Sequence, residues 1–183
     1  MKGLPKVYKR SEIFPEPEWE ALVEELFNHK GTVFLMGATS SGKSTLARYL
    51  IEKLLSKDTV ISLIDSDIGQ SSLGVPGTIN IKIFKTAMDI KNFVTEKIFF
   101  IGSLNPAKKI SLMIEGSKKL VDIARAKSEI VLVDSTGLIN GEAAKAFIDR
   151  HLGWLSLAFV ILLVGGFWIV GRKARSVSRS SAD

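Results

Sequence analysis

Cysteine is absent from the 183 residues of this chain, and histidine occurs only at His29 and His151. The absence of cysteine excludes a disulfide framework, a thiolate metal site and a thiol nucleophile. Two histidines are also too few for the usual zinc ligand sets. The first 17 residues are charged and have no apolar core, so we expect no secretory signal. The 46% hydrophobic share predicts one domain with a real core.

No strong excess of one charge is present, since 25 basic residues face 19 acidic ones and give a net charge of +6. Half of this excess lies in residues 151–183, where four basic residues face Asp183, a sum of +3. A mildly basic chain is compatible with nucleic acid but does not require it.

The spacing of apolar residues predicts alternating helices and strands. Such alternation indicates an α/β fold with a mostly parallel sheet covered by helices on both faces. We expect helices over 18–28, 44–55 and 107–127, strands over 32–36, 59–64, 97–101 and 129–133, and an edge strand over 80–84.

A stretch without charge follows, "LGWLSLAFVILLVGGFWIVG", over residues 152–171. At about 1.5 Å per residue it would span roughly 30 Å as a helix, which is the hydrocarbon thickness of a bilayer. Trp154 and Trp168 lie near its ends, and a basic cluster follows. We therefore predict a transmembrane helix over 151–171, and with it membrane association; a buried core helix is the alternative.

The segment "GATSSGKST" fits the pattern G-x-x-x-x-G-K-[ST] and lies between a predicted strand and a predicted helix. In such a loop the backbone N–H groups surround a phosphate, the lysine reaches the β- and γ-phosphates, and the following hydroxyl binds Mg²⁺. A chance glycine-rich turn is the alternative. The predicted nucleotide-binding residues are Gly37, Ala38, Thr39, Ser40, Ser41, Gly42, Lys43, Ser44 and Thr45.

Two further strands are predicted to end in carboxylates. Asp65 and Asp67 in "LIDSDIGQSSLGVPGTI" lie at the same sheet edge as the loop, where they would bind Mg²⁺ or take a proton from an attacking hydroxyl, and Gln70 would orient a nucleophile. Which aspartate has which role stays open, and one of them capping a turn is the alternative. In "EIVLVDSTGLING", Asp134 and Gly137 form a D-x-x-G pattern for Mg²⁺ and the γ-phosphate, unless this is an ordinary turn.

These blocks, together with "FFIGSLNP", resemble the polynucleotide 5′-hydroxyl-kinase family over roughly residues 30 to 141. That family includes archaeal RNA kinases and their eukaryotic pre-mRNA cleavage and rRNA-processing relatives. The resemblance implies transfer of the γ-phosphate of ATP, with Mg²⁺, to the 5′-hydroxyl of RNA, and in some members of DNA. It also implies that Asp67 activates the hydroxyl, with Lys43, Asp65 and Gln70 completing the catalytic set and Ser44, Asp65 and Asp134 serving the metal.

The resemblance further implies that the Pro76-Gly77-Thr78 turn lines the acceptor path and that Gly102, Ser103 and Pro106 shape the wall beside it. Phe99 and Phe100 are interpreted as core residues. The arginine-bearing lid of the family is not visible in the sequence.

The predicted division is a lead-in and helix over 1–29, an incomplete P-loop kinase domain over 30–150, the membrane helix over 151–171 and a basic tail over 172–183. We expect a cytoplasmic catalytic domain anchored by that helix. Three alternatives stay open: a P-loop ATPase or GTPase that uses water, a non-catalytic membrane-tethered nucleotide-binding module, and a truncated or frame-altered reading after residue 141.

Overall fold

The structure is a computed structural model that describes residue 13 and residues 15–38, 40–92, 94–135, 157–164 and 167–174. Helices and strands alternate along most of this length, as expected. The elements are α1 (Pro17–His29), β1 (Gly31–Gly37), α2 (Lys43–Leu55), β2 (Ile61–Asp65), β3 (Thr78–Phe84), α3 (Ala87–Lys91), β4 (Lys97–Phe100), η1 (Pro106–Lys108), α4 (Ile110–Arg125), β5 (Ile130–Asp134), β6 (Leu157–Val164) and β7 (Phe167–Ala174).

One mixed sheet organises the described residues, with the strand order β4-β3-β2-β5-β1-β6-β7. Its central strands β2, β5, β1 and β6 are parallel. Antiparallel neighbours close both sides, β3 and β4 next to β2, and β7 next to β6. Because β2 and β4 are both antiparallel to β3, the carboxyl ends of β1, β2, β4 and β5 meet at one edge of the sheet.

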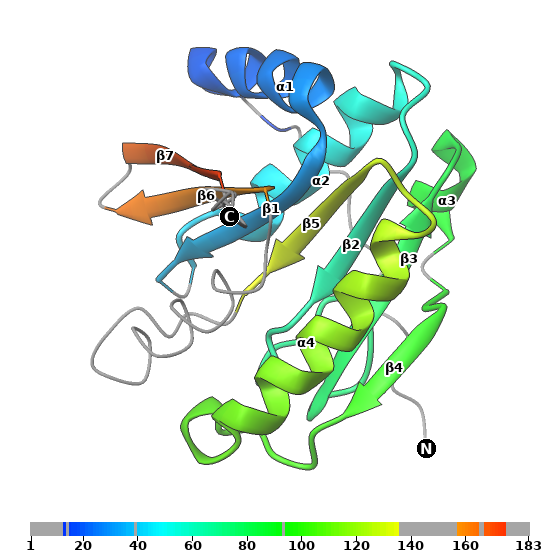
Figure 1. The fold of residues 1–183 in the computed structure, drawn as a ribbon, viewed down its shortest axis with the longest axis vertical. Coiled ribbons are helices and arrows are strands. Elements are labelled where there is room, and N and C mark those ends of the chain that lie inside the picture. Colours follow the sequence, from blue (N-terminus) through cyan, green and yellow to red (C-terminus); the bar gives the residue numbers. More distant parts are fainter. Residues whose placement is uncertain are drawn as a thin grey trace, which may run out of the picture.

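Helices cover both faces of the sheet (Figure 1). On one face, α1 and α2 enclose a core that contains Trp19, Leu50 and Phe84. On the other face, α4 packs through Met113 and Leu120 against the isoleucines of β3. Strands β2 and β5 are buried at every position, as expected for parallel strands covered on both sides.

The predicted transmembrane helix over 151–171 is wrong, because most of this stretch forms two strands of the sheet. β6 pairs in parallel with β1, from Thr32↔Ala158 to Gly37↔Leu163, and β7 pairs antiparallel with β6. Without β6, the side of β1 that faces away from β5 would leave its backbone N–H and C=O groups without partners. No helix in the described part of the chain has both the length and the apolarity to cross a bilayer.

The error has a physical source, since an apolar run alone does not distinguish a strand from a buried or membrane helix. Two glycines, at positions 165 and 166, lie between β6 and β7, two segments of eight residues that are rich in branched and aromatic side chains. Gly-Gly between two such segments is a sequence typical of a two-residue hairpin connection. The predicted tail over 172–183 begins inside β7, and residues 175–183 lie outside the described residues.

β3 was predicted as an edge strand, but it pairs with β2 on one side and with β4 on the other. Its polar residues Asn80 and Lys82 alternate with isoleucines, which resembles a solvent-facing pattern. Both are nevertheless buried. Lys82 Nζ lies 3.9 Å from Asp89 Oδ1 and 5.6 Å from the centre of the Phe84 ring, which accounts for its burial.

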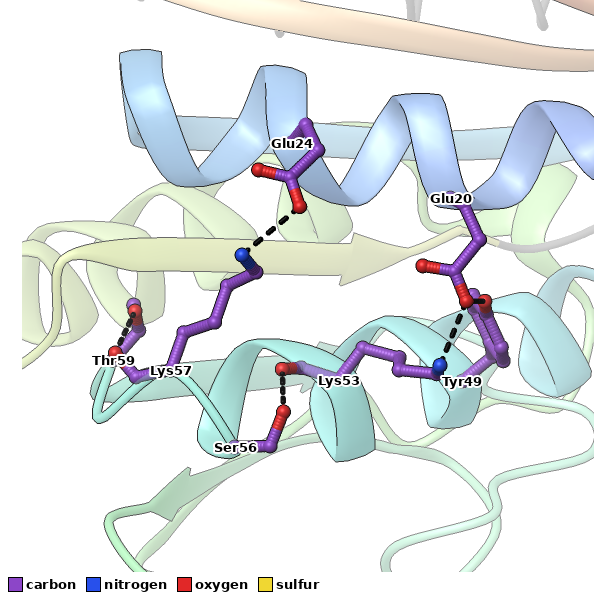
Figure 2. Close-up of polar contacts among 7 residues, drawn as sticks. All are labelled: Glu20, Glu24, Tyr49, Lys53, Ser56, Lys57 and Thr59. Atoms are coloured by element: carbon purple, nitrogen blue, oxygen red, sulfur yellow. Dashed lines mark hydrogen bonds and ion pairs between the residues drawn. The ribbon is translucent and has the colours of Figure 1, made fainter.

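Helix α1 is held on α2 by polar contacts at the rim of the core (Figure 2). Glu20 Oε1 accepts a hydrogen bond of 2.5 Å from the Tyr49 hydroxyl and one of 2.7 Å from Lys53 Nζ. Lys57 Nζ lies 2.9 Å from Glu24 Oε1. Beneath them, the Trp19 and Tyr49 rings meet edge to face at 5.1 Å. Burial and the bond to Glu20 raise the pKa of Tyr49 to about 12, so its hydroxyl stays protonated and continues to donate.

We expect Tyr49→Phe to lower the free energy of unfolding by about 1 kcal/mol, because the hydrogen bond to Glu20 is lost while the ring contact with Trp19 remains. Urea denaturation measures this change. Ser56→Ala is the control, since its hydroxyl donates only to the Lys53 carbonyl at an exposed helix end. Equal stability of Tyr49→Phe and wild type would show that the contact does not hold α1.

Candidate active site

The loop between β1 and α2 has the conformation that its glycines permit. Gly42 has φ +92°, which is the left-handed region, and it directly precedes α2. A Cβ at Gly42 would meet nothing within 4 Å, so the glycine is required by backbone conformation and not by crowding. Lys43 Nζ donates to the carbonyls of Gly37 (2.9 Å) and Ala38 (2.8 Å). The ammonium group therefore lies on the loop that would surround a phosphate.

Ser44 and Asp134 meet at the same edge of the sheet. The Ser44 hydroxyl donates to Asp134 Oδ2 at 2.8 Å, which links α2 to the end of β5. Asp134 is paired in register with Leu35 of β1 on one side and with Asp65 of β2 on the other. Burial is the main cause that raises the pKa of Asp134 to about 6; the Ser44 hydrogen bond lowers it and the charges of Asp65 and Asp67 raise it.

Asp65 is buried, and its carboxylate is occupied by its own loop. Oδ1 accepts from the Asp67 N–H at 3.0 Å. Oδ2 accepts from the Ser71 hydroxyl, from the N–H and hydroxyl of Ser72 and from the Leu73 N–H, at 2.5–3.0 Å. Burial raises the pKa of Asp65, while these hydrogen bonds lower it. The contacts make Asp65 the anchor of the loop after β2.

Asp67 is placed differently. It is half-buried, and its Oδ1 accepts from the N–H groups of Gly69 (3.2 Å) and Gln70 (3.1 Å), which forms a tight turn. Its Oδ2 has no hydrogen bond among the described residues. Gln70 is exposed beside it. Of the two aspartates that sequence reasoning left unassigned, Asp67 has the oxygen that is free to accept a proton.

Three polar residues that sequence reasoning missed hold this loop: Ser71, Ser72 and Asn80. Besides the contacts of both serines with Asp65, Asn80 Nδ2 lies 3.2 Å from the Ser71 hydroxyl and 2.9 Å from that of Thr78. The signal in the sequence is Asn80 itself, an amide in the otherwise β-prone segment "TINIKIF". The network ties the loop to β3 on one side and to Asp65 on the other.

The stretch "FFIGSLNP" ends β4 and continues into a second loop that lies on the first. The N–H groups of Ile101 and Gly102 donate to the Gly77 carbonyl at 2.9 and 3.1 Å. Gly77 itself has φ +81° and donates to the Ile68 carbonyl. The glycine of the predicted Pro76-Gly77-Thr78 turn therefore joins the two loops.

The interpretation of Phe99 and Phe100 as core holds only for Phe99. Phe99 is partly buried, packs against the core under α4 and lies under Lys119 Nζ at 5.5 Å. Phe100 is 73% exposed. The difference follows from strand alternation: in β4 adjacent side chains point to opposite faces, and only one of these faces is covered by α4.

The site has a donor set that fits a magnesium ion carried by a nucleotide. Among the described residues there is no group of three or more acidic, histidine or cysteine side chains that could hold a metal ion. Mg²⁺, however, commonly takes one or two protein oxygens and completes its shell with phosphate oxygens and water. The Ser44 hydroxyl and the buried Asp134 carboxylate supply such a pair, whereas the hydrogen bonds of Asp65 leave it little capacity to bind a metal. Thr39 and Gly137 lie outside the described residues.

A P-loop beside the buried ends of two parallel strands defines a P-loop nucleotide-binding fold. The chain belongs to the family described as mRNA cleavage and polyadenylation factor CLP1 P-loop, whose family model matches residues 37–164. The match confirms the predicted resemblance. It also continues past Gly141, where the predicted resemblance ended, and across β6.

Related proteins agree with this assignment. The chain is 38% identical over 146 residues to the polyribonucleotide 5′-hydroxyl-kinase of Methanocaldococcus jannaschii. The aligned region covers 77% of this chain and 39% of the relative. It is 33% identical over 142 residues to the kinase of the same description from Pyrococcus horikoshii, and 26% identical to the protein described as polyribonucleotide 5′-hydroxyl-kinase Clp1 of Danio rerio. The chain thus spans about two fifths of the length of these archaeal relatives.

Solved structures show the same fold. The wild-type Clp1p–Pcf11p complex matches with a TM-score of 0.56 at 17% identity, over 80% of this chain and 40% of the matched chain. A second structure of Clp1p with Pcf11p matches with a TM-score of 0.54, over 78% of this chain.

We expect Asp134→Asn to change how stability depends on pH. The folded pKa of Asp134, about 6, lies above its ordinary value of 3.8. The folded state therefore binds the proton of the Asp134 carboxyl group more tightly than the unfolded state does. This tighter binding stabilises the wild-type fold fully below about pH 4, and the stabilisation is lost as the pH rises to about 6. Asparagine still accepts from Ser44 but does not ionise.

The free energy of unfolding of Asp134→Asn relative to wild type should therefore increase between about pH 4 and 6 and stay level above. Urea denaturation of the nucleotide-free proteins with a chelator measures it. A difference that does not change with pH would contradict the burial argument.

Gly74→Ala should destabilise the loop after β2. A Cβ at Gly74 would lie 2.2 Å from Oδ1 of the buried Asn80, whose hydrogen bonds prevent it from moving away. We expect a loss of about 1–3 kcal/mol in the free energy of unfolding. Gly69→Ala is the matched control, because its Cβ would make only an ordinary 3.5 Å contact with the Leu104 carbonyl. Equal stabilities of the two variants in thermal unfolding would argue against this packing.

Proposed function

We propose that this chain carries an ATP-dependent kinase that transfers the γ-phosphate to the 5′-hydroxyl of RNA. The observation that carries the proposal is the placement of Asp67, whose free oxygen lies at the sheet edge where the P-loop and Asp134 also lie. The names of the archaeal relatives support the substrate class. Since the chain spans about two fifths of those relatives, the complete activity is part of the proposal.

The nucleotide would bind through residues of the P-loop. The N–H groups of residues 37–45 would surround the phosphates, and Lys43 Nζ would exchange its two carbonyl partners for phosphate oxygens. Ser44 and Asp134 would hold Mg²⁺, which supplies charge neutralisation at the phosphates when bound. Thr45 would lie near the α-phosphate, and Gly137 would contact the γ-phosphate.

On the acceptor side, the 5′-hydroxyl oxygen attacks the γ-phosphorus. A new P–O bond forms while the bond from the γ-phosphorus to the bridging oxygen breaks, and ADP leaves. The hydroxyl proton passes to Asp67 Oδ2, the oxygen that has no hydrogen bond among the described residues. Gln70 borders the acceptor path.

Asp65 acts through the loop that it anchors. Its five hydrogen bonds fix the residues from Asp67 to Leu73 and thereby orient the Asp67 turn. We therefore place Asp65 as a positioning residue, with Lys43 and Asp67 as the catalytic pair. The predicted role of Asp65 as a metal ligand is less well supported than those of Ser44 and Asp134, because its oxygens are already occupied.

Asp67→Asn should reduce phosphate transfer to RNA by about 100-fold or more, because the amide cannot take the proton. Nucleotide affinity should stay unchanged, since the hydrogen bonds of Asp67 among the described residues all lie within its own loop. Transfer is followed with γ-labelled ATP and an RNA oligonucleotide, and ATP affinity by calorimetry.

Lys43→Ala is the comparison variant and should lose both transfer and ATP affinity. Full transfer by Asp67→Asn would rule out Asp67 as the proton acceptor. Phosphate release without labelled RNA in the wild type would favour water as the acceptor.

A further inference from the structure

We propose that the segment from Phe100 to Lys109, which we call the strand-binding segment, binds the nucleotides that follow the 5′ end of a single-stranded nucleic acid. Phe100 would stack on a base, and Lys108 and Lys109 would contact phosphodiesters. The inference rests on the proposed function, because it assigns a surface to the acceptor of the same site.

The position of the segment supports this role. It begins where β4 ends, and β4 runs in the same direction as β2, so the segment starts at the edge of the sheet that carries Asp65 and Asp134. A Cβ on Gly69 would lie 3.5 Å from the Leu104 carbonyl and 3.6 Å from Asp67 Oδ1. The backbone of the segment therefore lies beside the turn that holds Asp67, with room for about one methyl group between them.

Two large apolar side chains of the segment face solvent, since Phe100 is 73% and Leu104 61% exposed. The Phe100 ring is supported from one side: a Cβ at Gly102, where φ is +70°, would lie 3.0 Å from its Cε1 atom. A glycine in this left-handed conformation lets the backbone turn beneath the ring. A supported and exposed aromatic ring is a surface on which any nucleobase can stack.

The charge of the segment matches a polyanion. Lys108 and Lys109 are both exposed, and neither forms an ion pair with any residue that the structure describes. The acidic residue that follows on α4, Glu115, is paired with Lys119 at 2.7 Å and does not neutralise them. Two unpaired ammonium groups beside exposed apolar side chains fit a ligand that carries both phosphates and flat bases.

The test measures binding of a fluorescent single-stranded RNA oligonucleotide with a 5′-hydroxyl by anisotropy, over a range of salt concentrations, with the full chain. For the double variant Lys108→Ala/Lys109→Ala we expect weaker binding and a salt slope that is smaller by about 1.4, at about 0.7 per lost phosphate contact. Phe100→Ala should weaken binding by about tenfold, and Phe100→Tyr should restore it.

The matched control is Lys91→Ala/Lys97→Ala. It removes the same charge from exposed residues at the end of α3 and the start of β4, at the opposite edge of the sheet. Its affinity and salt slope should equal those of the wild type. Unchanged ATP affinity in every variant verifies that the fold is intact.

The outcomes separate this inference from the proposed function. RNA binding by the wild type with the expected losses, but without phosphate transfer, would support the strand-binding segment and overturn the kinase. Phosphate transfer by the wild type, together with RNA affinity that the lysine and phenylalanine variants leave unchanged, would overturn the role of the strand-binding segment. The proposed kinase activity would then still stand. A wild type that binds no RNA at low salt would also overturn the segment.

Discussion

The site depends on the burial of two carboxylates side by side, Asp65 and Asp134, at the ends of adjacent parallel strands. Burying a charge is costly unless donors surround it. Among the described residues the Asp134 carboxylate has one donor, the Ser44 hydroxyl, and burial raises its pKa to about 6. Asp65 has five donors, all from the loop that follows it. The hydrogen bonds to the Asp65 carboxylate fix the shape of that loop. The Asp134 carboxylate, with fewer donors, keeps the capacity to bind a cation.

The shaped loop connects these carboxylates to the acceptor side. Its first turn presents Asp67, its middle is tied to β3 through Ser71 and Asn80, and its end at Gly77 binds the loop after β4. Phosphoryl transfer depends mainly on positioning and on preorganised charge, so a loop fixed at both ends is what such a reaction needs. The exposed residues from Phe100 onward extend the same edge.

Much of this fold was predictable because its signals are local. The P-loop is recognised from Gly37, Gly42 and Lys43 in a strand-to-helix context, and the parallel core from its short apolar runs. The C-terminal strands were mistaken for a helix, because an uncharged run has no period and only its glycine pair indicates a hairpin. Asp65 and Asp67 look equivalent in sequence, since their difference consists of hydrogen bonds that exist only once the loop has folded.

Transfer of labelled γ-phosphate from ATP by the unaltered chain tests most directly whether these residues form a kinase site. The wild-type protein is incubated with Mg²⁺ and two RNA oligonucleotides of the same sequence, one with a 5′-hydroxyl and one with a 5′-phosphate. If the site is a 5′-hydroxyl kinase, label appears only on the oligonucleotide that carries the hydroxyl. Equal phosphate release with both oligonucleotides, and label on neither, would contradict this assignment.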